Sequence, residues 1–228
     1  MPIYIEKGFK TARPNELLIK TSPFEWLQEY KPNTIQQKKN EDDVSFLERL
    51  KKLKEKQEYF ISGSIEPYNE EKNKWRRVSD DIMKRDLIII DYDDIDTDTA
   101  TFIEQVKSAL PNTALIFYPS LRYTDNKPRM RVVIEPSRPL VKYEYEMIGL
   151  EIAKKIGLLY DPSFTTWTQL QGLPVITTLN KEQPLQVVEG QKYPIPNNIE
   201  PPIKENIAPV IKGLNDNRAF IPYNDAVQ

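Results

Sequence analysis

The chain of 228 residues contains no cysteine and no histidine. Without cysteine it has neither a disulfide framework nor a thiolate-bound zinc site. Without histidine, imidazole acid–base catalysis, histidine-bound zinc and the Ser-His-Asp triad are excluded. Any catalysis must therefore use carboxylates, lysine, arginine, tyrosine, serine or a metal ion held by oxygen ligands.

Long apolar runs and an excess of one charge are also missing. No stretch approaches the roughly 20 apolar residues that cross a bilayer, and the first residues lack a signal-peptide core. Lys and Arg number 32 against 34 Asp and Glu, so any contact with nucleic acid must come from a local basic cluster. We therefore expect a soluble, cytoplasmic protein without a membrane partner, built as one large domain or two small ones.

The most informative segment is 87–94, an apolar run followed at once by acids. Its β-branched residues, bounded by polar ones, predict a buried strand. Because strand side chains alternate between faces, Asp91 and Asp93 point the same way. Two such carboxylates repel each other unless a cation lies between them, and Mg²⁺ or Mn²⁺ suits oxygen ligands. The alternative is an acidic turn in which a later aspartate caps the next helix.

The chain before this strand is expected to form an N-terminal α/β unit, residues 1–85, that packs on the core. Residues 1–40 are irregular and punctuated by proline, which predicts an extended segment. An amphipathic helix begins at residue 43, where Asp42 or Asp43 can cap it. A strand at 60–65 and a charged loop follow.

From residue 86 the elements follow one another in an orderly way. We expect strands and helices in the order βαββαβ, at 87–92, 99–110, 114–118, 129–135, 142–156 and 173–178. This is the order of the α+β ferredoxin-like or RRM-like fold, an antiparallel sheet with both helices on one face. We assign residues 86–180 to this core, and the proline-rich residues 181–228 to a C-terminal extension or linker.

In the ferredoxin-like order the first and third strands are neighbours. The end of the first strand, with Asp91 and Asp93, then lies beside the start of the third, where Arg129 and Arg131 share one face. We expect this face to be open, with the N-terminal unit covering part of it so that a cleft forms.

Basic residues gather at 118–131 in an otherwise nearly neutral chain, namely Arg122, Lys127, Arg129 and Arg131. Acids that could hold metal and bases that could hold a triphosphate therefore meet at one site. Phosphoryl and nucleotidyl transfer require this pairing. The alternative for the arginines is a solvated hairpin edge with ordinary ion pairs.

A third acid is expected at a two-metal site. Asp161 is the candidate, because it follows an apolar helix end and leads toward the last strand. Its alternative role is an Asx turn before Pro162. Arg76 and Arg77, just ahead of the acidic strand, and Lys127 are candidates for contacts with template phosphates.

Taken in order, these segments resemble the primase–polymerase domains of the archaeo-eukaryotic primase (AEP) superfamily, in the branch found in phages, plasmids and genomic islands. The resemblance covers roughly residues 60–178. It rests on the runs LIIIDYDD at 87–94, YPS at 118–120, PRMRVVI at 128–134, IGLLYDPS at 156–163 and QLQGLP at 169–174.

The resemblance implies roles for individual residues. Asp91 and Asp93 correspond to the acid-x-acid motif that binds catalytic metal, and Asp161 to the third-motif acid. Ser120 and Arg122 stand where the family has Ser-x-His, whose histidine contacts the phosphates of the nucleotide. Arginine can bind phosphate but cannot give up its proton. Family members use Mg²⁺ or Mn²⁺, nucleoside triphosphates and a single-stranded DNA template, and are often fused to a helicase.

Three hypotheses follow. The leading one is a primase or primase–polymerase of a mobile element, in which Asp91, Asp93 and Asp161 are catalytic metal ligands and Ser120, Arg122, Arg129 and Arg131 bind the triphosphate. The second is a catalytically silent module that binds single-stranded DNA; RRM-like sheets do so through aromatic residues, whereas the central strands here are aliphatic. The third is a metal-dependent nuclease that uses the same acids.

Overall fold

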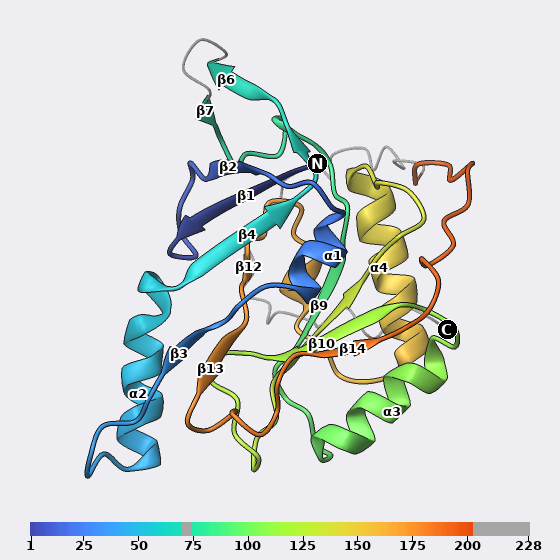
Figure 1. Ribbon diagram of the computed structural model, residues 1–228. Coiled ribbons are helices and arrows are strands. Elements are labelled where there is room, and N and C mark those ends of the chain that lie inside the picture. The colour runs from blue at the N-terminus through green and yellow to red at the C-terminus, as the bar shows by residue number, and fades with distance from the viewer. Residues whose placement is uncertain (70–73, 203–228) are drawn as a thin grey trace, which may run out of the picture.

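The computed structural model describes residues 1–69 and 74–202 and contains, over that range, two four-stranded antiparallel sheets (Figure 1). The N-terminal sheet has the order β12-β4-β1-β2, with the bounds Gln171–Gly172, Glu58–Ser62, Pro2–Lys7 and Asn15–Leu18. The central sheet has the order β14-β10-β11-β9, with the bounds Gln186–Val188, Leu115–Pro119, Met130–Ile134 and Ile88–Tyr92.

Shorter pairs and helices surround these sheets. The pairs are β13 with β3 (Val175–Thr177, Asn33–Ile35), β5 with β8 (Ser64–Ile65, Ile82–Lys84) and β6 with β7 (Pro67–Asn69, Lys74–Trp75). The helices are α1 (Pro23–Gln28), α2 (Asp43–Leu53), α3 (Thr99–Ala109) and α4 (Lys142–Ile156), with short 3₁₀ turns at η1 (Lys54–Lys56) and η3 (Pro162–Thr165).

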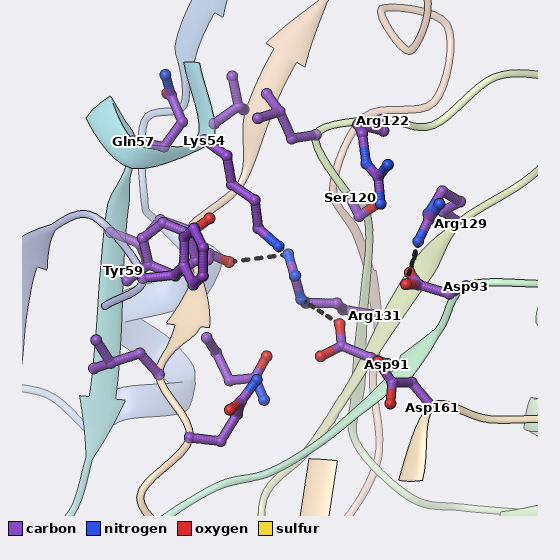
Figure 2. A pocket seen from close by; sticks show the side chains of 18 of the residues that line it. Lys54, Gln57, Tyr59, Asp91, Asp93, Ser120, Arg122, Arg129, Arg131 and Asp161 are labelled. Atoms are coloured by element: carbon purple, nitrogen blue, oxygen red, sulfur yellow. Dashed lines mark hydrogen bonds and ion pairs between the residues drawn. The ribbon is translucent and has the colours of Figure 1, made fainter. Parts of the chain in front are cut away.

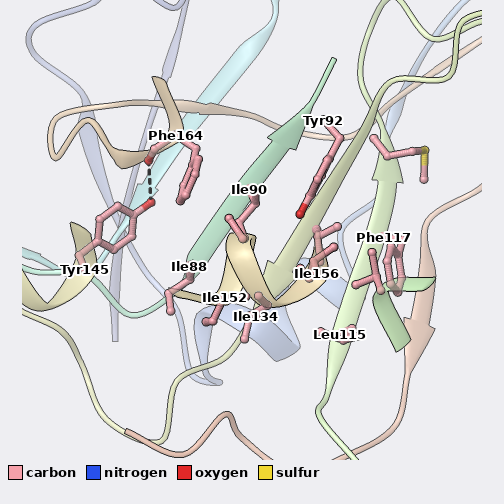
Figure 3. Close-up of a cluster of buried hydrophobic side chains, with 14 of the residues drawn as sticks. Ile88, Ile90, Tyr92, Leu115, Phe117, Ile134, Tyr145, Ile152, Ile156 and Phe164 are labelled. Atoms are coloured by element: carbon pink, nitrogen blue, oxygen red, sulfur yellow. Dashed lines mark hydrogen bonds between the residues drawn. The ribbon is translucent and has the colours of Figure 1, made fainter. Parts of the chain in front are cut away.

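Both faces of β9 are buried. On one face, Ile88 and Ile90 lie in a buried cluster with Ile152 of α4 (Figure 3). The same cluster includes Phe102 of α3. On the other face, Ile89 belongs to a second cluster, which includes residues of α1 and β4. A strand covered on both faces has no solvent side, which explains why residues 87–90 are continuously apolar rather than alternating.

The predicted helices are confirmed, and local signals explain where they begin and end. Asp98 caps α3 by accepting a hydrogen bond from the Thr101 N–H at 2.9 Å, and Asp42 caps α2 in the same way. Helix α4 ends at Gly157, whose φ of 73° lies in the left-handed region that glycine adopts without strain. Charged or glycine residues at these positions therefore determined the helix ends.

The prediction that residues 1–40 are irregular is wrong, because they form β1, β2, α1 and β3. Strand β1 pairs with β4, which lies far along the chain, so its stability comes from a partner that local pattern does not reveal. The strand predicted at 60–65 is divided by Gly63, whose φ is 121°. The charged loop that follows it lies partly outside the described residues.

The pairing predicted for the last strand of the core, residues 173–178, is also wrong. Residues 173–178 were expected to pair beside the first strand of the core, but β13 pairs in parallel with β3, and the adjacent β12 pairs with β4. The fourth place in the central sheet is taken by β14, which pairs with β10. The order β14-β10-β11-β9 therefore leaves β9 at an edge, and the specific βαββαβ core is not confirmed, although the fold is mixed α and β with antiparallel sheets.

The C-terminal extension is partly folded onto the core. Besides β14, it contributes Ile195, which is 7% exposed and belongs to the same buried cluster as Ile88. That cluster also contains Tyr59 and Ile61, so it spans the predicted boundary at residue 85. The division into three domains stays a prediction, and residues 203–228 lie outside the described range. Within residues 1–69 and 74–202, no helix is long and apolar enough to cross a membrane.

Candidate active site

A cleft of about 880 Å³, part of it open to solvent, is lined by residues of both four-stranded sheets (Figure 2). Every residue that the sequence predicted for metal or nucleotide binding lines it, namely Asp91, Asp93, Asp161, Ser120, Arg122, Arg129 and Arg131. The structure thus places these residues together, and their chemical roles stay predictions.

The acids and arginines meet because β9 and β11 are neighbours. In their antiparallel register Asp91 lies opposite Arg131, as expected for the first and third strands of the core. Arg131 Nε lies 2.5 Å from Asp91 Oδ1, and Arg129 donates from Nε to Asp93 at 3.1 Å (Figure 2). Arg129 also forms an ion pair with Asp93 through Nη2. Each acid of the pair therefore has its own arginine in this conformation.

The surroundings of Asp91 disfavour the ionised form of its carboxyl group. Burial raises the pKa of the Asp91 carboxyl, and the charge of Arg131 opposes this rise. The charges of Asp93 and of Asp161 raise the same pKa further, because each disfavours a second negative charge nearby. A cation placed among these three carboxylates would relieve that repulsion.

Asp161 lies in the cleft and also forms the predicted turn, while its role as a metal ligand stays a prediction. Its backbone N–H donates to the carbonyl oxygen of Asp91 at 2.9 Å, which holds it beside the end of β9. Its side chain accepts from the Ser163 N–H at 2.9 Å and so caps the η3 turn. The turn and the placement in the cleft are therefore compatible, because one carboxylate oxygen makes the cap.

The three carboxylates suit a hard divalent cation, since Mg²⁺ and Mn²⁺ prefer oxygen ligands. As placed, however, no group of three acids within residues 1–69 and 74–202 is arranged to hold a metal ion. In this conformation the carboxylates of Asp93 and Asp91 are paired with Arg129 and Arg131 instead. The donor atoms are of the type that these metals prefer, and metal binding stays a prediction.

The residues predicted for template contacts lie outside the lining of the cleft. Arg76 pairs with Asp81 at 2.8 Å, and Lys127 pairs with Asp94 at 2.7 Å. Arg77 donates to the carbonyl oxygen of Thr11 at 2.9 Å and to that of Thr168. Their intramolecular partners explain their positions, and a role in template binding stays a prediction.

Several lining residues were not predicted. Lys54 and Tyr59 come from the N-terminal unit, and Gln171 and Gly172 come from β12. The Gly172 carbonyl accepts from Arg131 at 3.3 Å and from the Tyr118 hydroxyl at 3.0 Å, so β12 holds the arginine in place. The only sequence signal was the QLQGLP run, which carried the resemblance without an assigned role.

Gln171 is 1% exposed, and neither polar atom of its side chain has a hydrogen-bond partner in the part of the chain that the structure describes. A buried amide without partners costs about 1–3 kcal/mol per group. Burial also raises the pKa of Tyr59, in the same wall, to about 12. The wall formed by Tyr59 and Gln171 is therefore neutral, and the ionised groups of the cleft lie elsewhere.

Comparison with known families identifies the chain. The model of the VapE N-terminal domain matches residues 29–171, more than half of the chain. The chain belongs to the VapE N-terminal domain family. This family is a primase-like replication domain, in agreement with the resemblance to the AEP superfamily. The match includes every acid and arginine of the cleft named above.

This VapE N-terminal domain was also compared with curated proteins and with solved structures. No curated protein matches the chain. Among solved structures, the AEP domain of the cyanophage S-2L primase–polymerase matches with a TM-score of 0.42 and 11% sequence identity, over 61% of this chain and 65% of that one. The match thus spans less than two thirds of the cyanophage domain.

Proposed function

We propose that this domain performs metal-dependent nucleotidyl transfer from a nucleoside triphosphate on a single-stranded DNA template. Membership of a primase-like replication family supports a replication-related, AEP-like role. The observation that carries the finer proposal is that Asp91, Asp93 and Asp161 line one cleft together with Arg129 and Arg131. This combination of oxygen ligands and phosphate-binding cations suits phosphoryl chemistry.

In this proposal the acids bind the metal ion and the arginines bind the phosphates of the nucleotide. Asp91, Asp93 and Asp161 would hold Mg²⁺ or Mn²⁺, which when bound would activate the attacking hydroxyl and stabilise the leaving pyrophosphate. Arg129 and Arg131 would transfer their hydrogen bonds from the carboxylates to the phosphate oxygens of the nucleotide. Arginine suits this exchange, because its planar guanidinium binds carboxylate and phosphate with the same geometry.

The decisive experiment is primer synthesis on a single-stranded DNA template, with nucleoside triphosphates and Mn²⁺ or Mg²⁺. Asp93→Asn should lower the rate at least about hundredfold, since a lost metal ligand removes several kcal/mol of transition-state stabilisation. Asp96→Asn is the matched control, because Asp96 is exposed, lies on the same acidic segment and does not line the cleft.

The result for Asp93→Asn decides between the hypotheses. Wild-type synthesis by this variant would refute the proposal. Digestion of DNA in Mg²⁺ without added triphosphates, lost in Asp93→Asn, would instead identify a nuclease that uses the same acids.

A second candidate is a catalytically silent module that binds nucleotide or single-stranded DNA. The ion pair between Arg131 and Asp91 favours it, because a protein that never binds metal would need such a partner for this buried acid. Binding of DNA without metal dependence and without nucleotide incorporation would support this candidate. A helicase, fused or separate, is the partner expected for either function.

A further inference from the structure

Four basic side chains line the cleft, and they fall into two classes. Arg129 and Arg131 each have an aspartate partner. Lys54 and Arg122 also line the cleft, but among residues 1–69 and 74–202 the side chain of neither has an ion-pair or hydrogen-bond partner. Counted with Asp161, the cleft holds four basic side chains against three carboxylates, so its lining carries an excess of one positive charge.

These two cations reach the cleft from different parts of the fold. Lys54 forms the end of α2, in the N-terminal unit, whereas Arg122 lies in the loop between β10 and β11. Both side chains extend from the walls into the cleft, and Lys54 approaches Arg131 (Figure 2). Lys54 is only partly exposed, so water screens these like charges incompletely.

The pKa of Lys54 is lowered by its surroundings. Burial lowers it, and the positive charges of Arg131 and of Arg122 lower it further. Partly buried cations that face one another without an anion raise the free energy of the cleft. An anion bound between them would remove that cost.

Arg122 already stands among the residues expected to bind the triphosphate; we propose that Lys54 joins it to form an anion site for the phosphate groups of the nucleoside triphosphate. This assignment rests on the proposed function and adds to it a residue of the N-terminal unit, so that the nucleotide is held from both sides of the cleft. The site lies beside the ion pairs of Arg129 and Arg131, which places the phosphates next to the acids.

The walls of the cleft suit a nucleotide, because Phe9 and Tyr59 supply an aromatic wall near Lys54. The Lys54 ammonium lies 4.6 Å from the centre of the Phe9 ring. This contact, with the preference of helix C-termini for cations, stabilises Lys54 alone and does not explain the position of Arg122.

The test measures binding of tripolyphosphate, without metal and at low salt, by isothermal titration calorimetry of the full chain. Lys54→Gln should weaken binding at least about tenfold, since charge-assisted hydrogen bonds are lost. Lys56→Gln is the matched control, because Lys56 carries the same charge in the same η1 turn, is exposed and lies outside the cleft. Lys54→Arg should retain binding, and thermal unfolding should show that each variant is folded.

Three results would overturn the assignment. One is wild-type affinity for tripolyphosphate in the folded Lys54→Gln and Arg122→Gln variants, and another is absence of binding by the wild-type chain. The third is a variant that loses affinity for a single-stranded oligothymidine but not for tripolyphosphate, which would assign Lys54 to the DNA.

Tripolyphosphate binding also tests the anion site independently of catalysis. Asp93→Asn, which tests catalysis, should bind tripolyphosphate at least as tightly as the wild type, because it removes a competing anion from Arg129. Phosphate binding that depends on Lys54, in a chain that makes no primer, would uphold the anion site and refute the polymerase.

Discussion

Replacing Arg131 by methionine tests the electrostatic organisation of the cleft most directly. The side chains of Arg131 and Asp91 are 15% and 10% exposed, so this ion pair is shielded from water. Removing one partner of a buried pair leaves the other charge uncompensated, which typically costs about 3–5 kcal/mol. The Gly172 carbonyl also loses the hydrogen bond from Arg131. We therefore expect Arg131→Met to lower the free energy of unfolding by about 3–5 kcal/mol.

The second variant in the cycle, Arg131→Met with Asp91→Asn, removes both charges. If the cost arises from the unpaired carboxylate, the double variant should be more stable than Arg131→Met alone by roughly 2 kcal/mol, a coupling typical of contacting residues. Arg122→Met is the matched control, because Arg122 lines the same cleft without a partner in the described chain and should change stability by less than about 0.5 kcal/mol.

Urea unfolding in the presence of a chelator, followed by circular dichroism, measures the wild type, Arg131→Met, Asp91→Asn and the double variant, together with the Arg122→Met control. The midpoint should shift while the dependence on denaturant stays constant, since the same surface is exposed on unfolding. The reasoning would be refuted by an Arg131→Met variant as stable as the wild type, or by strict additivity of the two substitutions.

Two further predictions concern neighbouring elements. Glu144, in the first turn of α4, accepts two hydrogen bonds from Arg138, which lower its pKa. Because the folded pKa lies below the unfolded one, this stabilisation is present above about pH 4.3 and is lost as pH falls through the folded pKa. Glu144→Gln should therefore cost on the order of 1 kcal/mol at pH 7, limited by screening around Arg138, and progressively less in acid-unfolding titrations. At Gly172, an added Cβ would lie 3.3 Å from side-chain atoms of both Arg131 and Tyr59. Gly172→Ala should therefore lower the free energy of unfolding in urea by about 1 kcal/mol and weaken nucleotide binding measured by calorimetry. Wild-type affinity for the nucleotide would show that Arg131 does not need this space.

The alternation of residues along the chain predicted much of the site. Asp91 lies on β9 and Arg131 on β11, and Asp93 and Arg129 lie one residue beyond an end of β9 and of β11, respectively. Strand alternation predicted that the members of each pair, Asp91 with Asp93 and Arg129 with Arg131, share a face. Pairing of β9 with β11 then brings the two faces together. Asp161 was predicted from the helix end before it and the strand expected after it, but that strand pairs with β3, and Asp161 is held beside Asp91 by its own backbone hydrogen bond.

Other lining residues could not be found in this way. Lys54 follows an ordinary amphipathic helix and resembles the lysines beside it, such as Lys56. Only the packing of the N-terminal unit on the central sheet turns one of these lysines into the cleft and leaves the other in solvent. Gly172 likewise became recognisable only from the side chains that close around it.

The sequence by itself determined the elements that carry a strong period or an end signal: β9, α3 and α4, with the caps at Asp98 and Gly157. Only the tertiary structure decided that β14 rather than residues 173–178 completes the central sheet, and that the acids of β9 are paired with arginines. The physical reason is that local patterns record which face of an element is apolar. The choice of partner depends on contacts between residues far apart in the chain, whose energies no short segment contains.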